Sequence, residues 1–289
     1  MPARLKVAII GTGRVGSVLG AALARAGHPV IGATAISEIS KLRAESLLPG
    51  VPIRSIDEVA KDADLLLLTV PDDALPDLVA GLAQTSAVSP GTFVVHTAGR
   101  FSDEVLDPLT KSGCLPIALH PVMTFTGTSI DLTRLAGCAF GVTAPDQLRA
   151  VADALVVEMG GEPTWVPRES RALYHAAISF GANNLMTLVN QSIDLLAQAG
   201  IVNPTNLVAP LFSAALDNAL RSGDQTITGP VARADVATIR AHMTALAQVS
   251  PEVVPSYLAL ARLTANRAIE SGSLDAPTAQ RLLEVLANE

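Results

Sequence analysis

This chain of 289 residues has few aromatic side chains and no excess of positive charge. Only 3% of the residues are aromatic, and 27 acidic residues outnumber 20 basic ones, which gives a formal net charge of −7 at pH 7. Proteins that bind nucleic acids need a basic field for the phosphates and often stack bases on aromatic rings. We therefore expect no nucleic-acid partner.

Cysteine and long apolar runs are scarce as well. Cys114 and Cys138 make neither a disulfide framework nor the CxxC spacing of a zinc site, so we expect two buried thiols and no bound metal. No apolar run reaches the roughly 18 residues that span a bilayer, and the first residues lead directly into a strand pattern rather than a signal peptide. These absences predict no membrane segment and a reducing, cytoplasmic setting.

The residues that are present predict a packed α/β protein, since 49% are hydrophobic and the mean hydropathy is +0.40. Up to residue 167, short apolar runs alternate with helical patterns, which is typical of a parallel sheet covered on both faces. The expected strands lie in "LKVAIIG", "PVIGAT", "DLLLLTVP", "GTFVVHTAG", "CLPIALHP" and "CAFGVTA", with a final edge strand in "GGEPTWVP". The expected helices of this part span residues 14–26, 37–47, 74–82, 102–111 and 146–159.

After residue 167 the β-type runs stop, and only helical patterns follow. The expected helices span residues 168–199, 204–221, 230–248, 251–268 and 277–287, most of them with proline at or near the first turn. The predicted fold is therefore a Rossmann-type, doubly wound, mostly parallel sheet over residues 1–167, followed by an all-helical domain over residues 168–289.

A dinucleotide-binding motif opens the chain. In "VAIIGTGRVG", Gly11, Gly13 and Gly16 have GxGxxG spacing between a strand and a helix. Such glycines permit a tight turn, let the backbone approach a pyrophosphate and let the helix pack closely on the strand. A merely structural glycine-rich turn is the alternative. The residues expected at the cofactor are Gly11, Thr12, Gly13, Arg14, Val15, Gly16, Ser37, Val70, Pro71 and His96.

The end of the second strand favours NADP over NAD. Thr34 and Ala35 stand where an acid would bind the ribose 2′-hydroxyl and repel a 2′-phosphate. Nearby residues offer positive charge or a hydroxyl group to that phosphate, and they are Arg14, Ser37, Lys41 and Arg43. Taken singly, each of these four is typical of a solvated surface.

Two histidines end predicted strands, His96 in "FVVHTAG" and His120 in "PIALHPVMTF". The carboxyl ends of parallel strands converge on the ligand crevice of a doubly wound sheet. Both histidines are therefore candidates for the site. The alternative is that each ring is hydrogen-bonded to loop backbone.

The longest predicted helix carries polar residues in its first half. His175, Ser179 and Asn183 follow an i, i+4, i+8 spacing and share one stripe. Because serine and asparagine are poor helix formers, we expect this stripe to face the nicotinamide. Hydrogen bonds between helices are the alternative explanation.

The stretch "TITGPVARAD" predicts a carboxylate-binding turn. Thr228 and Gly229 are expected to cap a helix with Pro230 in its first turn, and Arg233 adds a planar guanidinium one turn on. These residues are our candidates for substrate binding, with Asp235 orienting Arg233. A structural ion pair of Arg233 with Asp235 or another acid is the alternative.

Six motifs, "GTGRVG", "TVPDDAL", "HTAG", "ALHPVMTF", "YHAAISFGANNL" and "TGPVARAD", resemble bacterial Rossmann-like oxidoreductases that carry a helical C-terminal domain. That family is similar to the alternative ketopantoate reductases of pantothenate biosynthesis. It is more distantly related to the 6-phosphogluconate dehydrogenase, β-hydroxyacid dehydrogenase and pyrroline-5-carboxylate reductase group. The resemblance implies NADPH-dependent reduction of a small 2-oxo acid by a homodimer built through the helical domain.

One departure from the related enzymes concerns the proton donor. The β-hydroxyacid dehydrogenases carry Lys-x-x-x-Asn on their long helix, and matching that asparagine to Asn183 puts Ser179 in the place of the lysine. The chain has no lysine after Lys111. The proton must then come from His175, from His120 or from a water held by Asn183.

Three functions follow as hypotheses. The first is the 2-oxo acid reductase, with ketopantoate as the substrate. The second is an imine reductase of the pyrroline-5-carboxylate type, because an imine arrives already protonated and needs no strong protein acid. The third is a dinucleotide-binding protein without turnover.

Overall fold

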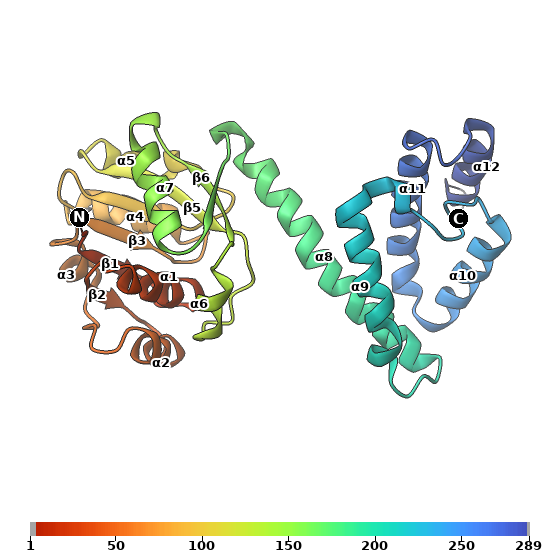
Figure 1. Ribbon diagram of the computed structural model, residues 1–289, viewed down its shortest axis with the longest axis horizontal. Coiled ribbons are helices and arrows are strands. Elements are labelled where there is room, and N and C mark those ends of the chain that lie inside the picture. The colour runs from red at the N-terminus through yellow and green to blue at the C-terminus, as the bar shows by residue number, and fades with distance from the viewer. Residues whose placement is uncertain (1–3, 288–289) are drawn as a thin grey trace. The chain divides into compact units, whose positions relative to one another are not determined.

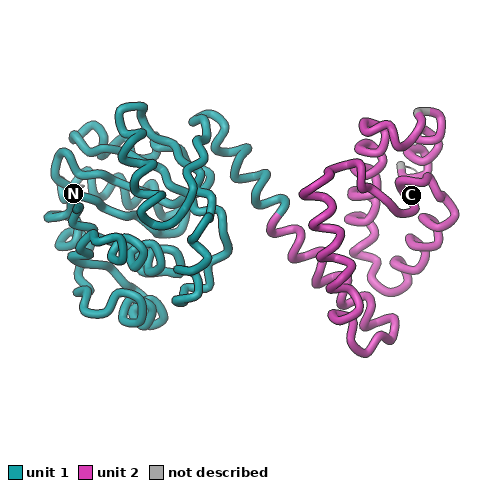
Figure 2. Tube along the Cα trace, in the orientation of Figure 1, with its two compact units in different colours: residues 1–181 teal, residues 182–289 magenta. Residues whose placement is uncertain are grey.

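The computed structural model describes residues 4–287, and the chain divides after Gly181 into two compact units (Figure 2). The sheet ends at Trp165, close to the domain boundary expected after residue 167. The division between the units comes later, inside the long helix that the sequence predicts to start the second domain. Each unit is described separately below.

Unit 1 contains one seven-stranded sheet (Figure 1). Its strands are β1 Val7–Ile10, β2 Val30–Thr34, β3 Leu65–Leu68, β4 Phe93–His96, β5 Leu115–Pro121, β6 Ala139–Thr143 and β7 Glu162–Trp165. They are ordered β2-β1-β3-β4-β5-β6-β7, and only the β5–β6 pair is antiparallel. The predicted mostly parallel sheet is confirmed, and β7 lies at its edge.

Helices cover both faces of this sheet. They are α1 Arg14–Arg25, α2 Glu38–Leu47, α3 Ile56–Ala60, α4 Leu75–Gln84, α5 Asp107–Thr110, α6 Ile130–Arg134 and α7 Arg149–Glu158, with short 3₁₀ turns η1 Asp103–Leu106 and η2 Asp146–Leu148. Along β1, Val7 and Ile9 pack with α1 and α7, while Ala8 and Ile10 pack with α3 and α4. This two-sided burial explains why the strand sequences are apolar throughout rather than alternating.

Two short helices, α3 and α6, lie outside the expected set. At the start of α3, the backbone amide and the hydroxyl of Ser55 both donate to Glu58 Oε2, at 3.0 Å and 2.6 Å. Helices of five residues are too short to show a 3.6-residue apolar repeat, so periodicity alone misses them.

Unit 2 is helical over its described residues. A 3₁₀ turn, η3 Arg168–Ser170, leads into α8 Arg171–Gln198, which begins in unit 1 and continues into unit 2. The following elements are α9 Pro204–Ser222, η4 Gly223–Thr226, α10 Val236–Val249, η5 Pro251–Val253, α11 Val254–Glu270 and α12 Ala276–Ala287. Ile239, Leu258, Ala265 and Leu282 form the centre of its core. Within residues 4–287, no helix combines the length and apolarity needed to cross a membrane.

The predicted start of α10 is wrong. The helix begins at Val236, and its N-cap is Asp235, whose carboxylate accepts hydrogen bonds from Thr238 N at 3.1 Å and Thr238 Oγ1 at 2.7 Å. Gly229 and Ala234 have φ values of 100° and 50°, which an α-helix does not allow. Thr228 and Gly229 therefore precede a non-helical turn and do not cap this helix.

Candidate functional site

The three glycines of the first turn have the backbone environments that a dinucleotide site needs. Gly11 has φ of 99°, and a Cβ built there would lie 2.9 Å from Thr69 O. A Cβ at Gly16 would overlap Gly11 O and the Thr69 side chain, so only glycine lets α1 pack this closely on the strands. A Cβ at Gly13 would meet nothing within 4 Å, so the space beside this residue is open. Of the three, Gly13 is the position where a ligand can approach the backbone.

Hydrogen bonds within the sheet edge hold this turn in place. Gly11 N donates to Thr34 Oγ1 at 2.9 Å, and Thr12 Oγ1 donates to Thr34 O at 3.0 Å and Ser40 O at 3.1 Å. Thr12 is buried, so its side chain supports the turn, and only its backbone remains for a ligand. Gly13 is the N-cap of α1 and provides no side-chain cap, which leaves the amides of the first helical turn available to a phosphate.

The residues proposed for a 2′-phosphate divide into two groups. Lys41 pairs with Glu38 at 2.7 Å, and Ser37 caps α2 by accepting from Ser40 N at 3.1 Å. Arg14 and Arg43 instead converge on the Gly127 turn, where a Cβ would lie 3.0 Å from Arg14 Cγ and 2.8 Å from Arg43 Nε. Among the described residues, neither arginine makes an ion pair, so both guanidinium groups are available to an anion.

The loop after β3 carries the remaining strand-end candidates. Val70 is half-buried and packs against the core on the α4 side of the sheet, while Pro71 is exposed. Because β3 lies next to β1, this loop lies beside the glycine turn, and Thr69 N donates to Ile10 O at 2.9 Å.

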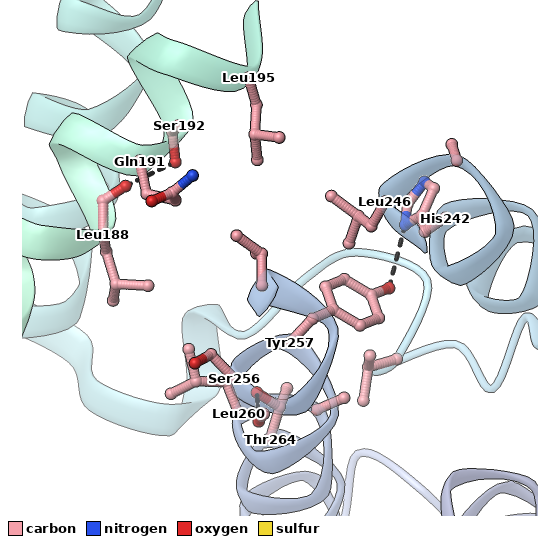
Figure 3. Close-up of a pocket in the computed structure, with 14 residues that line it drawn as sticks. Leu188, Gln191, Ser192, Leu195, His242, Leu246, Ser256, Tyr257, Leu260 and Thr264 are labelled. Atoms are coloured by element: carbon pink, nitrogen blue, oxygen red, sulfur yellow. Dashed lines mark hydrogen bonds between the residues drawn. The ribbon is translucent and has the colours of Figure 1, made fainter. Parts of the chain in front are cut away.

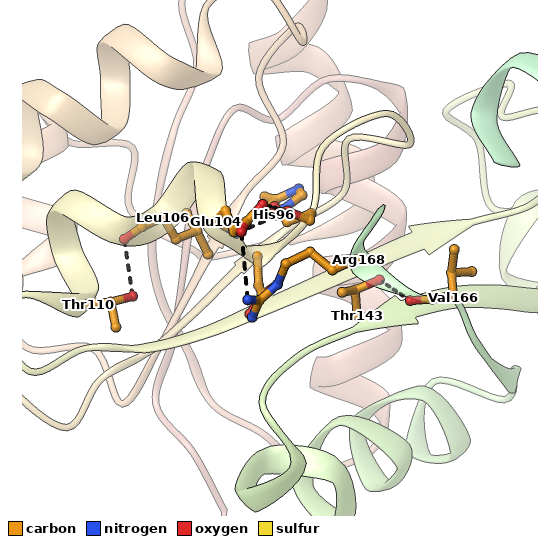
Figure 4. Close-up of polar contacts among 9 residues, drawn as sticks. His96, Glu104, Leu106, Thr110, Thr143, Val166 and Arg168 are labelled. Atoms are coloured by element: carbon orange, nitrogen blue, oxygen red, sulfur yellow. Dashed lines mark hydrogen bonds and ion pairs between the residues drawn. The ribbon is translucent and has the colours of Figure 1, made fainter. Parts of the chain in front are cut away.

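The His96 ring is hydrogen-bonded to loop backbone, which was the alternative to a role in the site. Its ring is fully buried, and Nε2 donates to the carbonyl of Ser102 at 3.0 Å (Figure 4). Burial lowers the pKa of His96 to about 3, so the ring is neutral at neutral pH. The hydrogen bond fixes the loop after β4, and no part of the His96 ring is exposed to a cofactor in this structure.

His120 and His175 lie together with their rings edge-on. Their ring centroids are 5.7 Å apart, and a Cβ built at Gly99 would lie 3.0 Å from Nε2 of both rings. Gly99 therefore leaves room for two imidazoles to face one backbone position. His175 is half-buried on the first turns of α8, and His120 is half-buried near the end of β5.

Tyr174 is the hydrogen-bond partner of His120, at 2.9 Å between Oη and Nδ1. Burial raises the pKa of Tyr174, so the phenol is protonated at neutral pH, and the backbone amide of Gly141 faces its oxygen and opposes that rise. The protonated phenol can donate to Nδ1, and in that arrangement the proton of the neutral His120 ring is on Nε2. Burial, followed by the charges of Arg171 and His175, lowers the pKa of His120 to about 4. His120 is accordingly a neutral hydrogen-bond donor, not the acid with a near-neutral pKa that the sequence led us to expect.

Arg171 is a residue of this cluster that the sequence analysis missed. Its side chain is 1% exposed, and none of its three guanidinium nitrogens has a hydrogen-bond partner among the described residues. The guanidinium carbon lies 5.6 Å from the centroid of the Tyr174 ring. Burial lowers the pKa of Arg171 to about 10, which still leaves the side chain charged at neutral pH. Its position in the first turn of the long helix was the available signal, because a cation at a helix N-terminus opposes the helix dipole.

Arg168, one turn earlier, contrasts with Arg171. It makes a bidentate pair with the buried carboxylate of Asp103, at 3.0 Å from Nε and 2.8 Å from Nη2. This pair ties η3 to η1, and Thr143 Oγ1 donates to Val166 O at 2.7 Å beside it (Figure 4). The start of α8 is thereby fixed against the carboxyl ends of β4 and β6.

The other predicted site residues are not part of the His120 cluster. Ser179 and Asn183 follow His175 along the continuous helix α8, and their side chains make no hydrogen bond among the described residues, so the interhelical alternative is not observed. Thr228 and Arg233 are exposed on unit 2. Asp235 is the cap of α10 rather than a partner that orients Arg233.

Unit 2 contains an apolar cavity of about 520 Å³ that the sequence does not indicate (Figure 3). Leu188, Leu195, Leu246 and Leu260 form much of its wall. A hydrogen bond of 3.0 Å joins His242 Nδ1 and the Tyr257 hydroxyl in its lining, which also includes the polar side chains of Gln191, Ser192, Ser256 and Thr264. None of the predicted site residues lines this cavity.

Curated relatives of this chain are dehydrogenases. A glycerol-3-phosphate dehydrogenase [NAD(P)+] from Bradyrhizobium sp. (strain BTAi1 / ATCC BAA-1182) is 30% identical over 225 residues, which cover 72% of this chain and 63% of that protein. The same enzyme from Thermus thermophilus is 26% identical over 240 residues, with 76% and 68% covered. The chain thus spans less than two thirds of the length of the Bradyrhizobium relative.

Solved structures share the fold at low sequence identity. A Bacteroides fragilis protein described as a candidate NADP oxidoreductase has a TM-score of 0.75 and 22% identity, and 90% of this chain and 98% of that one are covered. An imine reductase from Myxococcus stipitatus has a TM-score of 0.65 and 16% identity, with 97% and 100% covered. A pyrroline-5-carboxylate reductase from Coxiella burnetii has a TM-score of 0.54 and 15% identity, with 98% and 99% covered.

Two family models match different parts of the chain. Residues 1–121 match a Rossmann-like domain, which agrees with the glycine turn and the parallel strands of unit 1. Residues 138–264 match a domain of unknown function, DUF2520, which contains the end of the sheet and most of the helices from α8 to α11. By these matches, the chain joins a Rossmann-like domain to a DUF2520 domain.

Proposed function

We propose that this protein is an NAD(P)H-dependent oxidoreductase that reduces a small compound with a C=O or C=N group. The observation that carries the proposal is that one sheet holds both parts of such a site in one compact unit. The glycine turn after β1 leaves open space at Gly13, and the pair His120 and His175 lies near the end of β5. Ligands of doubly wound sheets bind along this edge.

The cofactor would be held by the glycine turn and the loop after β3. The amides at the start of α1 suit its pyrophosphate, and Val70 would line its path along the sheet edge. Arg14 and Arg43 support NADP over NAD, because they converge without acidic partners and Ala35, not an acid, directly follows β2. The cofactor supplies the hydride, and the protein supplies alignment and proton handling.

The two histidines would act on the substrate in different ways. His120 is neutral, with Nε2–H available, so it would donate a hydrogen bond to the oxygen or nitrogen of the reducible group. His175, whose ring has no hydrogen-bond partner among the described residues, would be the proton donor to the forming product. Ser179, one turn after His175 on α8 and also in unit 1, is a secondary candidate for a contact to the substrate, and the role of Asn183 stays a prediction from the sequence.

The substrate we propose first is a 2-oxo acid, with ketopantoate as its candidate. The second candidate is a cyclic imino acid such as pyrroline-5-carboxylate. It is favoured by one observation, namely that His120 is neutral and no lysine accompanies it, so an already protonated imine suits the site. The named activities of the relatives add glycerol 3-phosphate to the compounds worth testing.

A test is to follow NADPH and NADH oxidation by absorbance with ketopantoate and pyrroline-5-carboxylate, and NADP reduction with glycerol 3-phosphate. We expect one compound to be turned over, His175→Ala to reduce its turnover at least about 100-fold, and Arg43→Ala to reduce the preference for NADPH. Arg54→Ala, which changes an arginine that lines a surface pocket with Lys6 and Asp62, is the matched control for the cofactor. Nucleotide binding without turnover of any compound would support the non-catalytic hypothesis instead.

We also propose a homodimer formed through the helical region. Seven large apolar side chains of α9 and of the unit 2 part of α8 are between 42% and 79% exposed, and they are Leu185, Met186, Leu188, Leu207, Leu211, Leu216 and Leu220. Exposed apolar surface of this extent is typical of a protein interface. A second copy of the chain would bury it.

A further inference from the structure

The guanidinium of Arg171 is a buried positive charge without a counterion. Its Nε, Nη1 and Nη2 atoms are all inaccessible to solvent and have no hydrogen-bond partner among residues 4–287. Arginine stays ionised in proteins, so the charge cannot be removed by losing a proton. A buried charge without a partner costs several kcal/mol, and native proteins rarely keep one.

None of the neighbouring groups neutralises this charge. Asp103, the acid whose field reaches Arg171, is already in the bidentate pair with Arg168. The Tyr174 phenol is protonated, and the His96 and His120 rings are neutral. Because Nε2 of His96 donates to Ser102, its buried Nδ1 is an acceptor and supplies no negative charge. The balancing charge must therefore come from outside this group of residues.

Arg171 lies beside the residues that would handle the reducible group. The ring of Tyr174 is 5.6 Å from the guanidinium carbon, and the hydroxyl of the same ring is 2.9 Å from His120 Nδ1. The charge of Arg171 also lowers the pKa of His120. An anion bound by Arg171 would consequently lie close to a group in contact with His120 and His175.

We infer that Arg171 binds an oxyanion, a carboxylate or a phosphate ester, that the substrate carries next to its reducible group. The substrate class rests on the proposed function, whereas the anion site rests on the contacts of Arg171 alone. The planar fork of arginine suits two oxygens of either anion. Arg171, within unit 1, thereby takes the role that the sequence analysis gave to Arg233. The guanidinium is closed from solvent, so a neighbouring side chain moves when the anion binds, and association is slower than for an open site.

The test measures anion binding separately from turnover. Oxamate, glycerol 3-phosphate and inorganic phosphate are titrated into the full chain, with and without NADP, while heat release and the midpoint of thermal unfolding are recorded. The variants are Arg171→Met, which removes the charge, and Arg171→Lys, which keeps the charge but loses the fork. Arg149→Met is the matched control, because the Arg149 guanidinium lies on the Trp165 ring, 4.1 Å from its centroid, at the surface of the same unit.

We expect wild type and Arg149→Met to bind oxamate or glycerol 3-phosphate with equal affinity. Arg171→Met should weaken that binding at least about 30-fold, and Arg171→Lys should weaken it about 10-fold. Without anion, Arg171→Met should melt at the same temperature as wild type or higher, because it removes an unpaired buried charge. Tighter binding of oxamate indicates a carboxylate substrate, and tighter binding of glycerol 3-phosphate indicates a phosphate ester.

Three results would overturn the inference: no anion binds to wild type at millimolar concentration, Arg171→Met binds as wild type does, or Arg171→Met melts several degrees lower without anion. If Arg171→Met does not fold, Arg171→Lys replaces it in the test. The inference is then overturned if Arg171→Lys binds the anion with the affinity of wild type. If anion binding depends on Arg171 but no compound is turned over, the anion site is supported and the oxidoreductase proposal is contradicted. If a compound is turned over and its KM is unchanged in Arg171→Met, the oxidoreductase proposal stands and the anion site is wrong.

Discussion

At the scale of single residues, three histidines at one end of the sheet have three different environments. His96 is fully buried and bonded to the backbone, His120 is held by Tyr174, and His175 has no hydrogen-bond partner among the described residues. Their residue type is the same, and only burial and hydrogen bonding separate them. The division of labour proposed for His120 and His175 follows from these contacts.

Burial of neutral histidines predicts that stability falls in mild acid. The folded-state pKa values of His96 and His120 are about 3 and 4, below the ordinary value of 6.5, so the unfolded chain binds protons first. Their effect is absent above pH 6.5, and stability is lost as the pH falls from 6.5 toward 3. Each ring adds a slope of up to about 1.4 kcal/mol per pH unit within its window. Urea unfolding between about pH 7.5 and 4.5 measures this slope, and His96→Gln should make it shallower. Identical slopes in the two proteins would contradict the burial argument.

Tyr174→Phe tests how His120 is positioned. The variant removes the hydroxyl that donates to Nδ1, so His120 should sample both neutral tautomers, and stability should fall by about 1 kcal/mol. If the protein is an oxidoreductase, we expect turnover to fall about 10-fold, with a smaller change in KM. ¹⁵N NMR of the imidazole ring reads the tautomer directly. A single Nε2–H tautomer retained in the variant would mean that another group positions His120.

At the scale of elements, the turn between β1 and α1 separates two uses of glycine. Gly16 is required by packing, because a side chain there meets Gly11 O and Thr69. Gly13 is not, because the space beside it is open. Both glycines belong to the same GxGxxG motif, but close packing requires Gly16, whereas Gly13 leaves space for a ligand.

Gly13→Ala and Gly16→Ala should therefore fail in different ways. Gly13→Ala should keep the unfolding free energy of wild type within about 1 kcal/mol and weaken dinucleotide binding, because its methyl group occupies the space of the pyrophosphate. Gly16→Ala should lower stability by about 2 kcal/mol or more through overpacking. Chemical unfolding and nucleotide titration distinguish the two outcomes. Tight binding by folded Gly13→Ala would argue that the glycine turn is structural only.

At the scale of the whole molecule, the exposed leucines of α8 and α9 predict self-association. We expect light scattering after size exclusion to give twice the chain mass of 29.8 kDa. The double variant Leu211→Asp and Leu220→Asp should shift that mass to the monomer, since each charge would have to be buried in the interface. Ile36→Asp, a change at a 95% exposed apolar residue of unit 1, is the matched control. A monomeric wild type at micromolar concentration would contradict the proposed dimer.

The sequence by itself determined the order of the strands and of the longer helices, because apolar periodicity and proline or glycine at element ends are local signals. It also determined the glycine turn, whose three residues are close together along the chain. It failed at the start of α10, where Pro230 resembles a first-turn proline while Gly229 and Ala234 have backbone angles outside the helical range. Local composition does not carry that information.

Only the tertiary structure decided which residues of the candidate site belong together. It buried His96, joined His120 to Tyr174 and His175, and left Arg171 charged without a partner among the described residues. These outcomes depend on how β4, β5 and the start of α8 meet, and the bond from Tyr174 to His120 joins residues 54 positions apart. Burial and hydrogen bonding set the protonation of each group, and the residue type alone does not predict either of them. A histidine or an arginine therefore becomes a candidate functional group only once its neighbours in space are known.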